Sequence, residues 1–448
     1  MIRITDKHNC CGCEACVQAC PKQCISFEED NEGFRYPKVD DSLCVECGAC
    51  ERTCPILNSD AERKPQRQVA AINPDSIVRE QSSSGGIFTM LAEQVIRQKE
   101  GVVFGVRFDE HWQAVFDYTE TVDGLAAFRG SKYVQALVGQ SFLQAREFLK
   151  QGRMVLFSGS PCQIAGLRHF LRRDYDNLVT VDFICHGTPS PKVWSRYLDE
   201  VTQNAVHAIS DVQFRNKKQG WKRFNLEMAY DKDGQTVSLS SWHQKNHFMR
   251  IFLQNVILRP SCYSCKAKGG RSGSDITIAD FWGIQQLNPE MDDDMGTSLV
   301  MLHTEKGTTL YDSLNITRQW DTAYEDILKL NPSVERSAKE HDKRSQFFAR
   351  LDDAQSLIKL IDDTLRIPLS ARLIRLPKRI LSKGYHIFKS LVGGGKPEHP
   401  LTAVQSGWPD PVTVPQLSGQ YGIALVNFRS KHEGWKQYRL VIMMQKSD

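Results

Sequence analysis

The segment HNCCGCEACVQACPKQC, residues 8–24, contains six of the chain's 14 cysteines. A second segment, CVECGACERTCP at residues 44–55, contains four more. Cysteines at this density form disulfides in secreted proteins, whereas in the cytoplasm they more often bind metal. The first residues, MIRITDKHNC, show neither the apolar core nor the cleavage site of a signal peptide, and no stretch approaches the roughly 20 apolar residues of a membrane span. The sequence therefore predicts a cytoplasmic protein whose cysteines bind metal.

The spacing of these cysteines indicates iron–sulfur clusters. Two runs share the pattern C-x2-C-x2-C-x3-C-P of bacterial two-cluster ferredoxins. Their members are Cys10, Cys13, Cys16 and Cys20 in the first run and Cys44, Cys47, Cys50 and Cys54 in the second. The first three thiolates of a run bind one 4Fe-4S cluster and the fourth binds the other. We therefore expect Cys54 to complete the cluster of the first run and Cys20 that of the second. A pair of zinc sites is the disfavoured alternative, because zinc sites rarely show this duplication of eight thiols.

The rest of residues 1–58 completes an α+β ferredoxin-like two-cluster module. The segment CISFEEDNEGFRYPKVD, residues 24–40, predicts two short strands joined by an Asn-Glu-Gly turn. Cys11 and Cys24 fit neither run, and we expect Cys24 to pack as a small apolar residue. The polar segment SDAERKPQRQ, residues 59–68, predicts a linker.

Residues 66–350 predict an α/β domain with a mostly parallel sheet. Short apolar runs typical of strands alternate with segments that carry apolar residues at helical spacing. The strand segments are GVVFGVRF (101–108), RMVLFSGS (153–160) and LVTVDFICHG (178–187). The helix segments are GIFTMLAEQVIRQ (86–98), QIAGLRHFLRR (163–173) and PKVWSRYLDEVTQ (191–203). The formal net charge of +4 over 448 residues is too small to indicate nucleic-acid binding.

Two loops of this domain are candidates for binding a phosphate group. In SSSGGIF, residues 82–88, the hydroxyls of Ser83 and Ser84 and the amides of Gly85 and Gly86 precede a helix, whose N-terminus favours an anion. In RGSKYVQ, residues 129–135, Lys132 follows a Gly-Ser turn. Each motif has an ordinary alternative: a serine N-cap with a glycine turn, or a lysine in solvent.

The only cysteines after residue 60 are Cys162, Cys185, Cys262 and Cys265. Two of them follow predicted strands and two form a C-x2-C pair. Together they supply four thiols, the number of ligands that a third 4Fe-4S cluster needs. In the alternative, Cys162 and Cys185 are buried structural cysteines and the pair binds zinc or nothing.

Several segments together resemble the family of coenzyme F(420) hydrogenase and dehydrogenase beta subunits, in the bacterial form with an N-terminal two-cluster ferredoxin module. The segments, in order, are SSSGGIFTMLAEQVI (82–96), GSKYVQ (130–135), GSPCQIAGLRHFL (159–171), CHGTPSPKVW (185–194) and CYSCKAKGGRSGSDITIADFWG (262–283). The resemblance covers roughly residues 1–350. It implies an iron–sulfur flavoprotein that binds FAD, with the third cluster on the four later cysteines and flavin-phosphate contacts from the Ser83–Gly86 loop and Lys132. It also implies that Asp280 either helps to ligate or orient the site or is a structural cap.

The expected function is that of an oxidoreductase. A cluster carries one electron and a nicotinamide or deazaflavin carries two, so a flavin is needed to connect them. We expect electrons to pass between the clusters and a redox partner protein or soluble hydride carrier, and the sequence identifies no catalytic side chain. One alternative is a non-catalytic electron-transfer protein. Another is a redox accessory protein of surface polysaccharide biosynthesis, because some members of the family are fused to a polysaccharide pyruvyl transferase.

The C-terminal part predicts no complete domain. Residues 351–392 predict a basic helical extension that includes LSARLIRLPKRILSKGYHIFKSLV (369–392). It could lie on a membrane surface, but a solvated helix is favoured. Residues 393–448 predict a Gly/Pro-rich linker and a short tail, which begins like a strand and could be a truncated fused domain.

Overall fold

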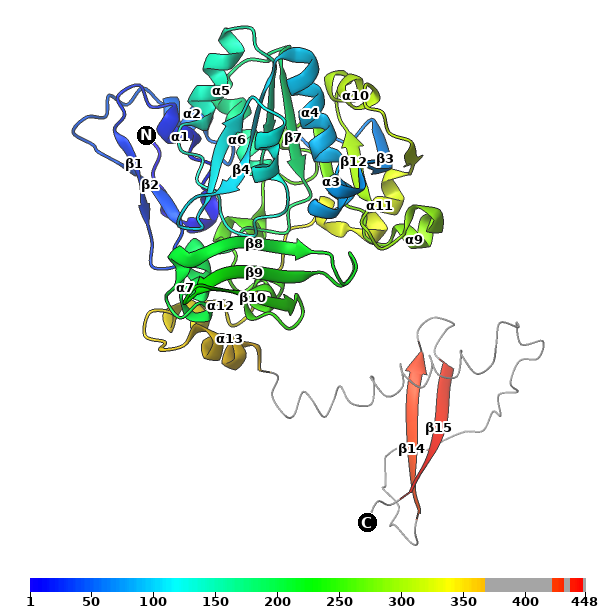
Figure 1. Cartoon of the computed structure of the whole chain (residues 1–448). Helices are drawn as coiled ribbons and strands as arrows, with labels where there is room; N and C mark the ends of the chain where they lie inside the picture. Colours follow the sequence, from blue (N-terminus) through cyan, green and yellow to red (C-terminus); the bar gives the residue numbers. More distant parts are fainter. Residues whose placement is uncertain (367–420, 431–435, 446–448) are drawn as a thin grey trace. The chain divides into compact units, whose positions relative to one another are not determined.

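The computed structural model describes residues 1–366, 421–430 and 436–445 (Figure 1). Met1–Ile367 form one compact unit and Pro368–Asp448 a second. In the second unit, strand β14 (Tyr421–Ser430) pairs antiparallel with β15 (Lys436–Gln445), which confirms that the tail begins with a strand. The predicted basic segment 369–392 and the linker from 393 to 420 lie outside the described residues. Among the described residues, we find no helix with the length and apolar character to span a bilayer.

The N-terminal module contains the predicted hairpin. Strand β1 (Ile25–Glu29) pairs antiparallel with β2 (Arg35–Val39). The turn closes because the Asp30 carboxylate accepts hydrogen bonds from the amides of Glu32 (3.0 Å) and Phe34 (2.9 Å), and because Gly33 adopts a φ of 85°. Two short helices, α1 (Ala15–Gln18) and α2 (Ala49–Thr53), carry part of the two cysteine runs.

The larger part of the first unit is built on an eight-stranded sheet. Its strand order is β13 (Arg318–Asp321), β3 (Arg67–Ile72), β12 (Ser298–Leu302), β11 (Ile276–Asp280), β7 (Leu178–Phe183), β6 (Val155–Ser158), β4 (Val102–Phe108) and β5 (Ala114–Thr119). The four strands β11, β7, β6 and β4 are parallel, as predicted. The strands outside them pair antiparallel, so the sheet as a whole is mixed.

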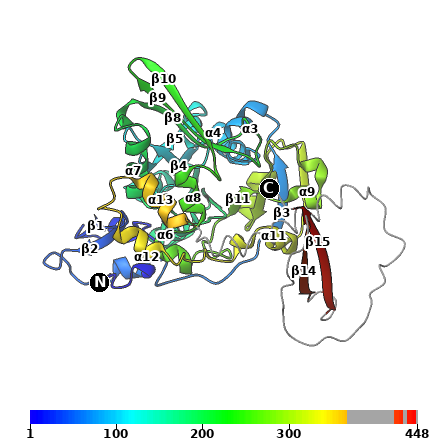
Figure 2. The ribbon, with the colours of Figure 1, turned by 90° about the horizontal axis from the view of Figure 1, so that it is seen from below.

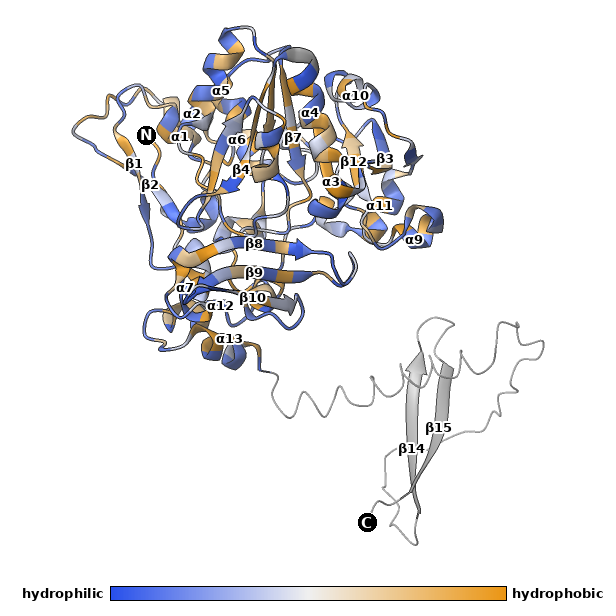
Figure 3. Ribbon diagram, in the orientation of Figure 1, coloured by the Kyte–Doolittle hydropathy of each residue, from blue (hydrophilic) through white to orange (hydrophobic). Residues whose placement is uncertain are grey.

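Helices cover both faces of this sheet, as alternating burial along the strands requires. On one face, α4 (Ile87–Lys99) packs against side chains such as Val103 and Leu156. On the other face, Val102 and Phe157 pack in the core that includes α5 (Ser141–Lys150), α6 (Pro161–Leu171) and α7 (Pro191–Val201). The three predicted helices and three predicted strands are confirmed. Figure 3 shows hydrophobic residues concentrated on the strands and helices of the interior, while the loops are mainly hydrophilic.

A second sheet was not predicted. Strands β8 (Ile209–Asn216), β9 (Asn225–Lys232) and β10 (Gln235–Trp242) form an antiparallel sheet, drawn below the central sheet in Figure 1. The β9–β10 loop consists of Asp233 and Gly234, both with positive φ, which is the geometry of a two-residue hairpin turn. The Asp-Gly pair at residues 233 and 234 could therefore have predicted this hairpin from the sequence. The remaining helices are α3 (Ser76–Gln81), α8 (His247–Leu253), α9 (Ile284–Leu287), α10 (Glu305–Asp312), α11 (Tyr324–Leu330), α12 (Arg344–Ala349) and α13 (Leu357–Leu365).

The ferredoxin-like module is docked on the α/β part rather than tethered to it. Figures 1 and 2 both show the module against α6, in agreement with the contacts of α1 and α2 with that helix. Glu14 accepts a hydrogen bond from the Gly139 amide (2.9 Å). Arg344 pairs with Glu32, and both side chains are largely buried, at 7% and 13% exposure. Removing either partner would leave an unpaired buried charge, which costs about 3–5 kcal/mol, so both residues are needed where the module meets the body.

Candidate functional site

The two cysteine runs follow the same backbone path. Gly12 (φ 71°) and Glu46 (φ 52°) occupy equivalent positions, two residues after the first cysteine of each run. Glu14 (φ 59°) and Gly48 (φ 67°) are equivalent in the same way. Left-handed backbone at non-glycine residues is uncommon, so its repetition at matching positions indicates two loops shaped for the same task. That task is to turn several thiols toward one centre.

The structure brings together both predicted sets of cluster ligands. Cys10, Cys13, Cys16 and Cys54 are all buried. Burial raises the pKa of Cys16, and the neighbouring thiols of Cys10 and Cys54 raise it further, which places Cys54 beside the first run. The second run lines a hollow of ≈ 340 Å³, open mouth included, and Cys20 of the first run lies on its wall with Cys44, Cys47 and Cys50. Among the described residues, no three Cys, His, Asp or Glu side chains are grouped so that they could hold a single metal ion.

Cys24 lies closer to the second set than its sequence position suggested. It is buried, as expected, and its Sγ lies 3.4 Å from Sγ of Cys20 on the wall of the same hollow. A spare thiol at this distance could replace Cys20 as a ligand in a Cys20 variant. Tests of the crossed ligand assignment must therefore remove both.

We expect Cys24→Ala to retain full iron content, because Cys24 is not part of either run. The double variant Cys20→Ala, Cys24→Ala should lose about four iron atoms per chain from the second-run cluster and keep the first-run cluster. Electron paramagnetic resonance of anaerobic protein, combined with iron analysis, measures this. A matched double variant, Cys54→Ala with Cys24→Ala, should instead lose the first-run cluster. Loss of the first-run cluster in the Cys20 variant would contradict the crossing.

The four later cysteines converge although they come from distant segments. Cys162 lies in the first turn of α6, and Cys185 follows the end of β7. Cys262 lies in the short 3-10 helix η4 (Pro260–Ser264), and Cys265 immediately follows it. Burial raises the pKa of Cys262, and the neighbouring thiols of Cys185, Cys162 and Cys265 add to the shift. The four thiols, all partly buried, are thus close enough for their charges to interact.

Polar groups around this set favour negative charge on sulfur. The amide of Thr188 donates to Cys262 Sγ (3.4 Å), and the hydroxyl of Ser160 lies 3.3 Å from Cys162 Sγ. The buried Lys268 donates to the carbonyl of Cys185 (2.6 Å). Burial raises the pKa of Cys185 to about 12, and the Lys268 charge opposes that shift. Amide and ammonium groups next to thiols are the outer contacts that stabilise thiolate ligands of a metal cluster.

Cys11, which the sequence left without a role, connects the two regions. Its buried thiol lies close enough to the thiols of Cys13 and Cys162 for each of them to shift its pKa. The approach is possible because α6 has Gly166 facing the module, where an added Cβ would lie 2.9 Å from Cys13 Sγ. The first-run cysteines and the later four therefore meet at Cys11. The sequence held one signal for this contact, the C-C pair, but gave no partner for it.

The two predicted phosphate-binding loops also meet. The hydroxyls of Ser83 and Ser131 lie 2.8 Å apart and are half-buried. Gly86 is the N-cap of α4, and beside Ser131 the Cβ direction of Gly130 faces open space. Other predicted groups are engaged within the protein. Ser84 donates to the carbonyl of Thr297 (2.7 Å), and Gly85 packs against backbone atoms of β3 and β12.

Lys132 is half-buried and donates to three carbonyls of its own loop, those of Ala127, Arg129 and Gly130. Burial lowers the pKa of its ammonium to about 7. In this structure, the three carbonyls take the place that an anion would take beside the ammonium. Lys132 therefore braces the loop that presents Ser131.

A buried polar and aromatic group that the sequence did not reveal lies next to these loops. Arg215 on β8 is 3% exposed and pairs with Asp280 at the end of β11 (Nη1 to Oδ2, 2.6 Å). Trp221 donates to Asp280 (3.0 Å) and stacks on Trp282, with ring centroids 4.4 Å apart. Asp280 is thus a partner of a buried arginine and a tryptophan. Only the fold brings β8 and β11 together, so sequence spacing could not have found this group.

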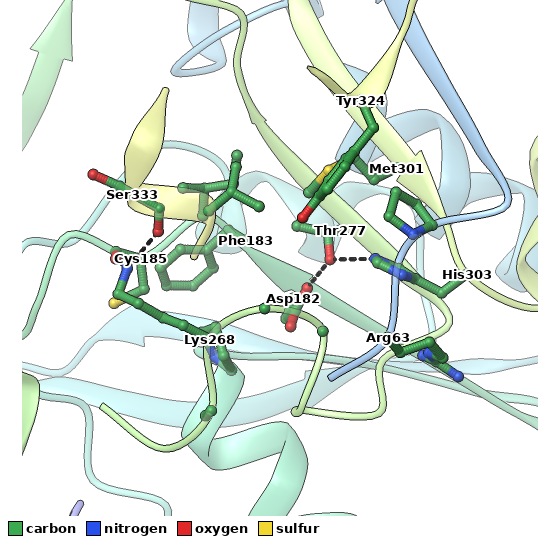
Figure 4. A pocket seen from close by; sticks show the side chains of 17 residues that line it. Arg63, Asp182, Phe183, Cys185, Lys268, Thr277, Met301, His303, Tyr324 and Ser333 are labelled. Atoms are coloured by element: carbon green, nitrogen blue, oxygen red, sulfur yellow. Dashed lines mark hydrogen bonds between the residues drawn. The ribbon is translucent and has the colours of Figure 1, made fainter. Parts of the chain in front are cut away.

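Near the later cysteines, a pocket opens between the 59–66 segment and the 267–270 loop (Figure 4). Its open space is ≈ 390 Å³, the mouth included, and Cys185 is part of its wall. Thr277 donates to Asp182 and lies 2.9 Å from Nε2 of His303. Burial raises the pKa of Asp182 to about 6 and lowers that of His303 to about 4, and in the latter case the charge of Arg63 contributes. At neutral pH the pocket therefore contains a neutral imidazole, which the Thr277 hydroxyl links to a carboxyl group whose pKa is raised toward neutrality.

Comparison with known proteins identifies two family domains in this chain. Residues 9–57 match the 4Fe-4S dicluster domain, which supports two 4Fe-4S clusters in the N-terminal module. Residues 152–325 match the C-terminal domain of the coenzyme F(420) hydrogenase/dehydrogenase beta subunit. The second match includes all four later cysteines as well as Arg215 and Asp280.

Two relatives and one solved structure are each similar to part of this chain. A subunit of the F(420)H(2) dehydrogenase of Methanosarcina mazei is 22% identical over 240 residues, which are 51% of this chain and 66% of the relative, just under two thirds of its length. The VorC subunit of the ketoisovalerate oxidoreductase of Methanothermobacter marburgensis is 31% identical over 58 residues, 12% of this chain and 73% of that protein. Among solved structures, a chain from the F(420)-reducing [NiFe] hydrogenase complex of Methanosarcina barkeri aligns with a TM-score of 0.41 and 16% identity, and the alignment covers 66% of this chain and 95% of that one.

The order of these two domains agrees with the positions of the cysteine runs and of the four later cysteines. The chain is thus similar to the coenzyme F(420) hydrogenase/dehydrogenase beta subunits and contains a match to their C-terminal domain, which an N-terminal 4Fe-4S dicluster domain precedes.

Proposed function

We propose that this protein is an iron–sulfur flavoprotein that passes electrons between its 4Fe-4S clusters and a soluble two-electron carrier. The observation that carries the proposal is that the module packs on α6, where an added Cβ at Gly166 would lie 2.9 Å from Cys13 Sγ, with Cys11 near both Cys13 and Cys162. Through this contact, the ferredoxin-like module and the later cysteines are separated by one side chain. Such proximity is what electron transfer between two redox centres of one protein requires.

The four later cysteines have the ligand number and chemistry for a third 4Fe-4S cluster. Cys162, Cys185, Cys262 and Cys265 would hold it, and the Thr188 amide and Lys268 would stabilise its thiolate charge. These four side chains would fix the cluster on the module side of the α/β domain, next to Cys11. The four residues are partly buried, and Cys185 also borders the pocket beside the 267–270 loop.

The Ser83 and Ser131 hydroxyls, the N-terminus of α4 and the open space at Gly130 fit the phosphate part of a flavin nucleotide, FAD by the family resemblance. A bound flavin would supply the exchange between hydride transfer and single-electron transfer. The chain's own part is to orient it: Ser83 and Ser131 would donate to phosphate oxygens, and Lys132 would keep the Ser131 loop in place. Arg215, held by Asp280, leaves its Nε without a hydrogen-bond partner among the described residues and so retains a donor for a ligand.

Electrons would enter or leave at the second-run cluster. Cys47 is the one exposed cysteine among the described residues, and Leu43 (55% exposed) and Val45 (58%) flank its loop. Exposed apolar residues beside a redox centre suit a redox partner protein. The relatives named for F(420) make a deazaflavin a candidate for the two-electron carrier at the other end.

The test is the iron and flavin content of anaerobically purified protein, together with its ultraviolet-visible spectrum. We expect about twelve iron atoms and one flavin per chain. About eight iron atoms without flavin, even after reconstitution, would favour the non-catalytic electron carrier instead.

A further inference from the structure

Arg259 is a buried cation with no acidic partner. Its side chain is 0% exposed, and among the described residues no carboxylate oxygen lies within 4.0 Å of its guanidinium. Nε donates to the carbonyl of Cys10 (2.7 Å), and Nη2 to the carbonyl of Arg35 (2.9 Å). The other buried arginines among the described residues each pair with a carboxylate: Arg79 with Asp293, Arg215 with Asp280 and Arg344 with Glu32. A buried charge without a counter-ion is costly, so an anion is expected beside Arg259.

The nearest sulfur identifies that anion. Nη2 of Arg259 lies 3.4 Å from Sγ of Cys10, the first ligand of the first-run cluster. A 4Fe-4S cluster with four thiolate ligands is negatively charged, and reduction adds one electron and one negative charge without making or breaking a bond. The guanidinium charge also acts on Cys162, on the other side of Cys11. Arg259 therefore lies between the first-run cluster and the later cysteines.

The surrounding residues are arranged to let the guanidinium reach this position. Gly12 (φ 71°) leaves room for it, because an added Cβ there would lie 2.9 Å from Nη1 of Arg259. Gln135 accepts from the same nitrogen (3.1 Å) through a neutral amide rather than a carboxylate. Tyr36 covers the guanidinium with its ring at 4.3 Å from Cζ. None of these neighbours carries a carboxylate, and the buried Glu14 interacts with the Arg259 charge only from beyond 4.0 Å.

We propose that Arg259 is a positioning residue for electron transfer, and that its charge raises the reduction potential of the first-run cluster. It stabilises the reduced form more than the oxidised form, because the reduced form carries the larger negative charge. The cluster beside the later cysteines then holds an electron more readily than it would without Arg259. This inference rests on the two clusters of the dicluster domain and is independent of the flavin and the third cluster.

The test is a redox titration of the full-length protein, followed by electron paramagnetic resonance. Arg259→Met keeps the apolar stem and removes the charge. We expect the reduction equilibrium of one cluster to shift at least tenfold toward the oxidised form, which is about 59 mV for a one-electron couple. Gln135→Glu keeps Arg259 and places a carboxylate 3.1 Å from Nη1, so it should shift the same cluster in the same direction. Lys38→Met removes an exposed charge of the module, whose side chain is 64% exposed, and should leave the potentials unchanged.

Iron content separates this inference from the cluster assignment, because every variant should hold the iron of the wild-type protein. If Arg259→Met fails to fold or loses iron, Gln135→Glu decides the result alone. Unchanged potentials in a fully loaded Gln135→Glu protein would overturn the proposal and leave Arg259 a structural link between the module and the body. A shift of equal size in Lys38→Met would also overturn it, because the effect would then be one of net charge.

Discussion

Cys185→Ala is expected to lower the iron content of anaerobically purified protein from about twelve to about eight atoms per chain. The four later cysteines are the expected ligands, and their partly buried thiols lie close enough for their charges to interact. Without Cys185 the cluster would keep only three thiolate ligands, and the spare thiol of this region, Cys11, acts on Cys162 rather than on Cys185. Iron analysis and electron paramagnetic resonance would show the loss of one cluster signal while the two signals of the module remain.

Cys162→Ala needs a different design, because the Cys11 thiol lies next to Cys162 and could take its place as a ligand. We expect Cys11→Ala to keep all iron, and the double variant Cys11→Ala, Cys162→Ala to match Cys185→Ala. Deleting residues 1–60 would be a poor test, since the Glu32–Arg344 pair and the Glu14–Gly139 hydrogen bond show that the module is part of the packed body. If Cys185→Ala retains the iron content of the wild-type protein, the third cluster is refuted.

The sequence predicted the parts of the fold that depend on local pattern. The ferredoxin-like module followed from cysteine spacing alone, because three ligands on one tight loop require fixed intervals. The strand and helix segments of the α/β part followed from apolar periodicity, which gave β4, β6, β7, α4, α6 and α7. The mixed character of the sheet could not be predicted in this way. Strands such as β3 and β12 are far apart in the chain, and their antiparallel pairing depends on tertiary packing.

The same distinction applies to the candidate sites. The four later cysteines could be counted from the sequence, but the contact of Cys11 with Cys162 could not, because it depends on how the module docks on α6. The Arg215–Asp280 pair joins residues of two sheets, and Arg259 reaches a cysteine 249 positions away. Arg215 and Arg259 are buried charges, and the fold determines which residues they contact. Sequence spacing predicts a contact only when both residues lie in one helix, hairpin or tight loop of known geometry.

The flavin gives the second large expected effect. Purified protein is expected to release FAD on denaturation, and Ser131→Asp to abolish flavin retention while the module keeps its iron. The Ser131 hydroxyl lies 2.8 Å from that of Ser83 and beside the open space at Gly130, so the new carboxylate would stand where a phosphate oxygen is expected. Two like charges at this distance in a half-buried site repel strongly. Gly86→Asp is less suitable, because Gly86 has a φ of 83° and an added Cβ would lie 3.1 Å from Cβ of Asn73, which would strain the backbone itself.

Ser131→Asn is the matched control, since it has nearly the same shape as Asp without the charge. We expect Ser131→Asn to retain flavin at a level near that of the wild-type protein, and the difference between the two variants to decrease at high salt, as an electrostatic effect should. Fluorescence of the released flavin measures retention, and iron analysis of the same samples reports the clusters. Equal flavin retention in Ser131→Asp and Ser131→Asn would show that this loop does not bind the flavin phosphate and that the flavin binds elsewhere. If folded protein with all its iron binds neither FAD nor FMN on reconstitution, the flavin proposal is refuted. The clusters would then exchange electrons only with single-electron partners.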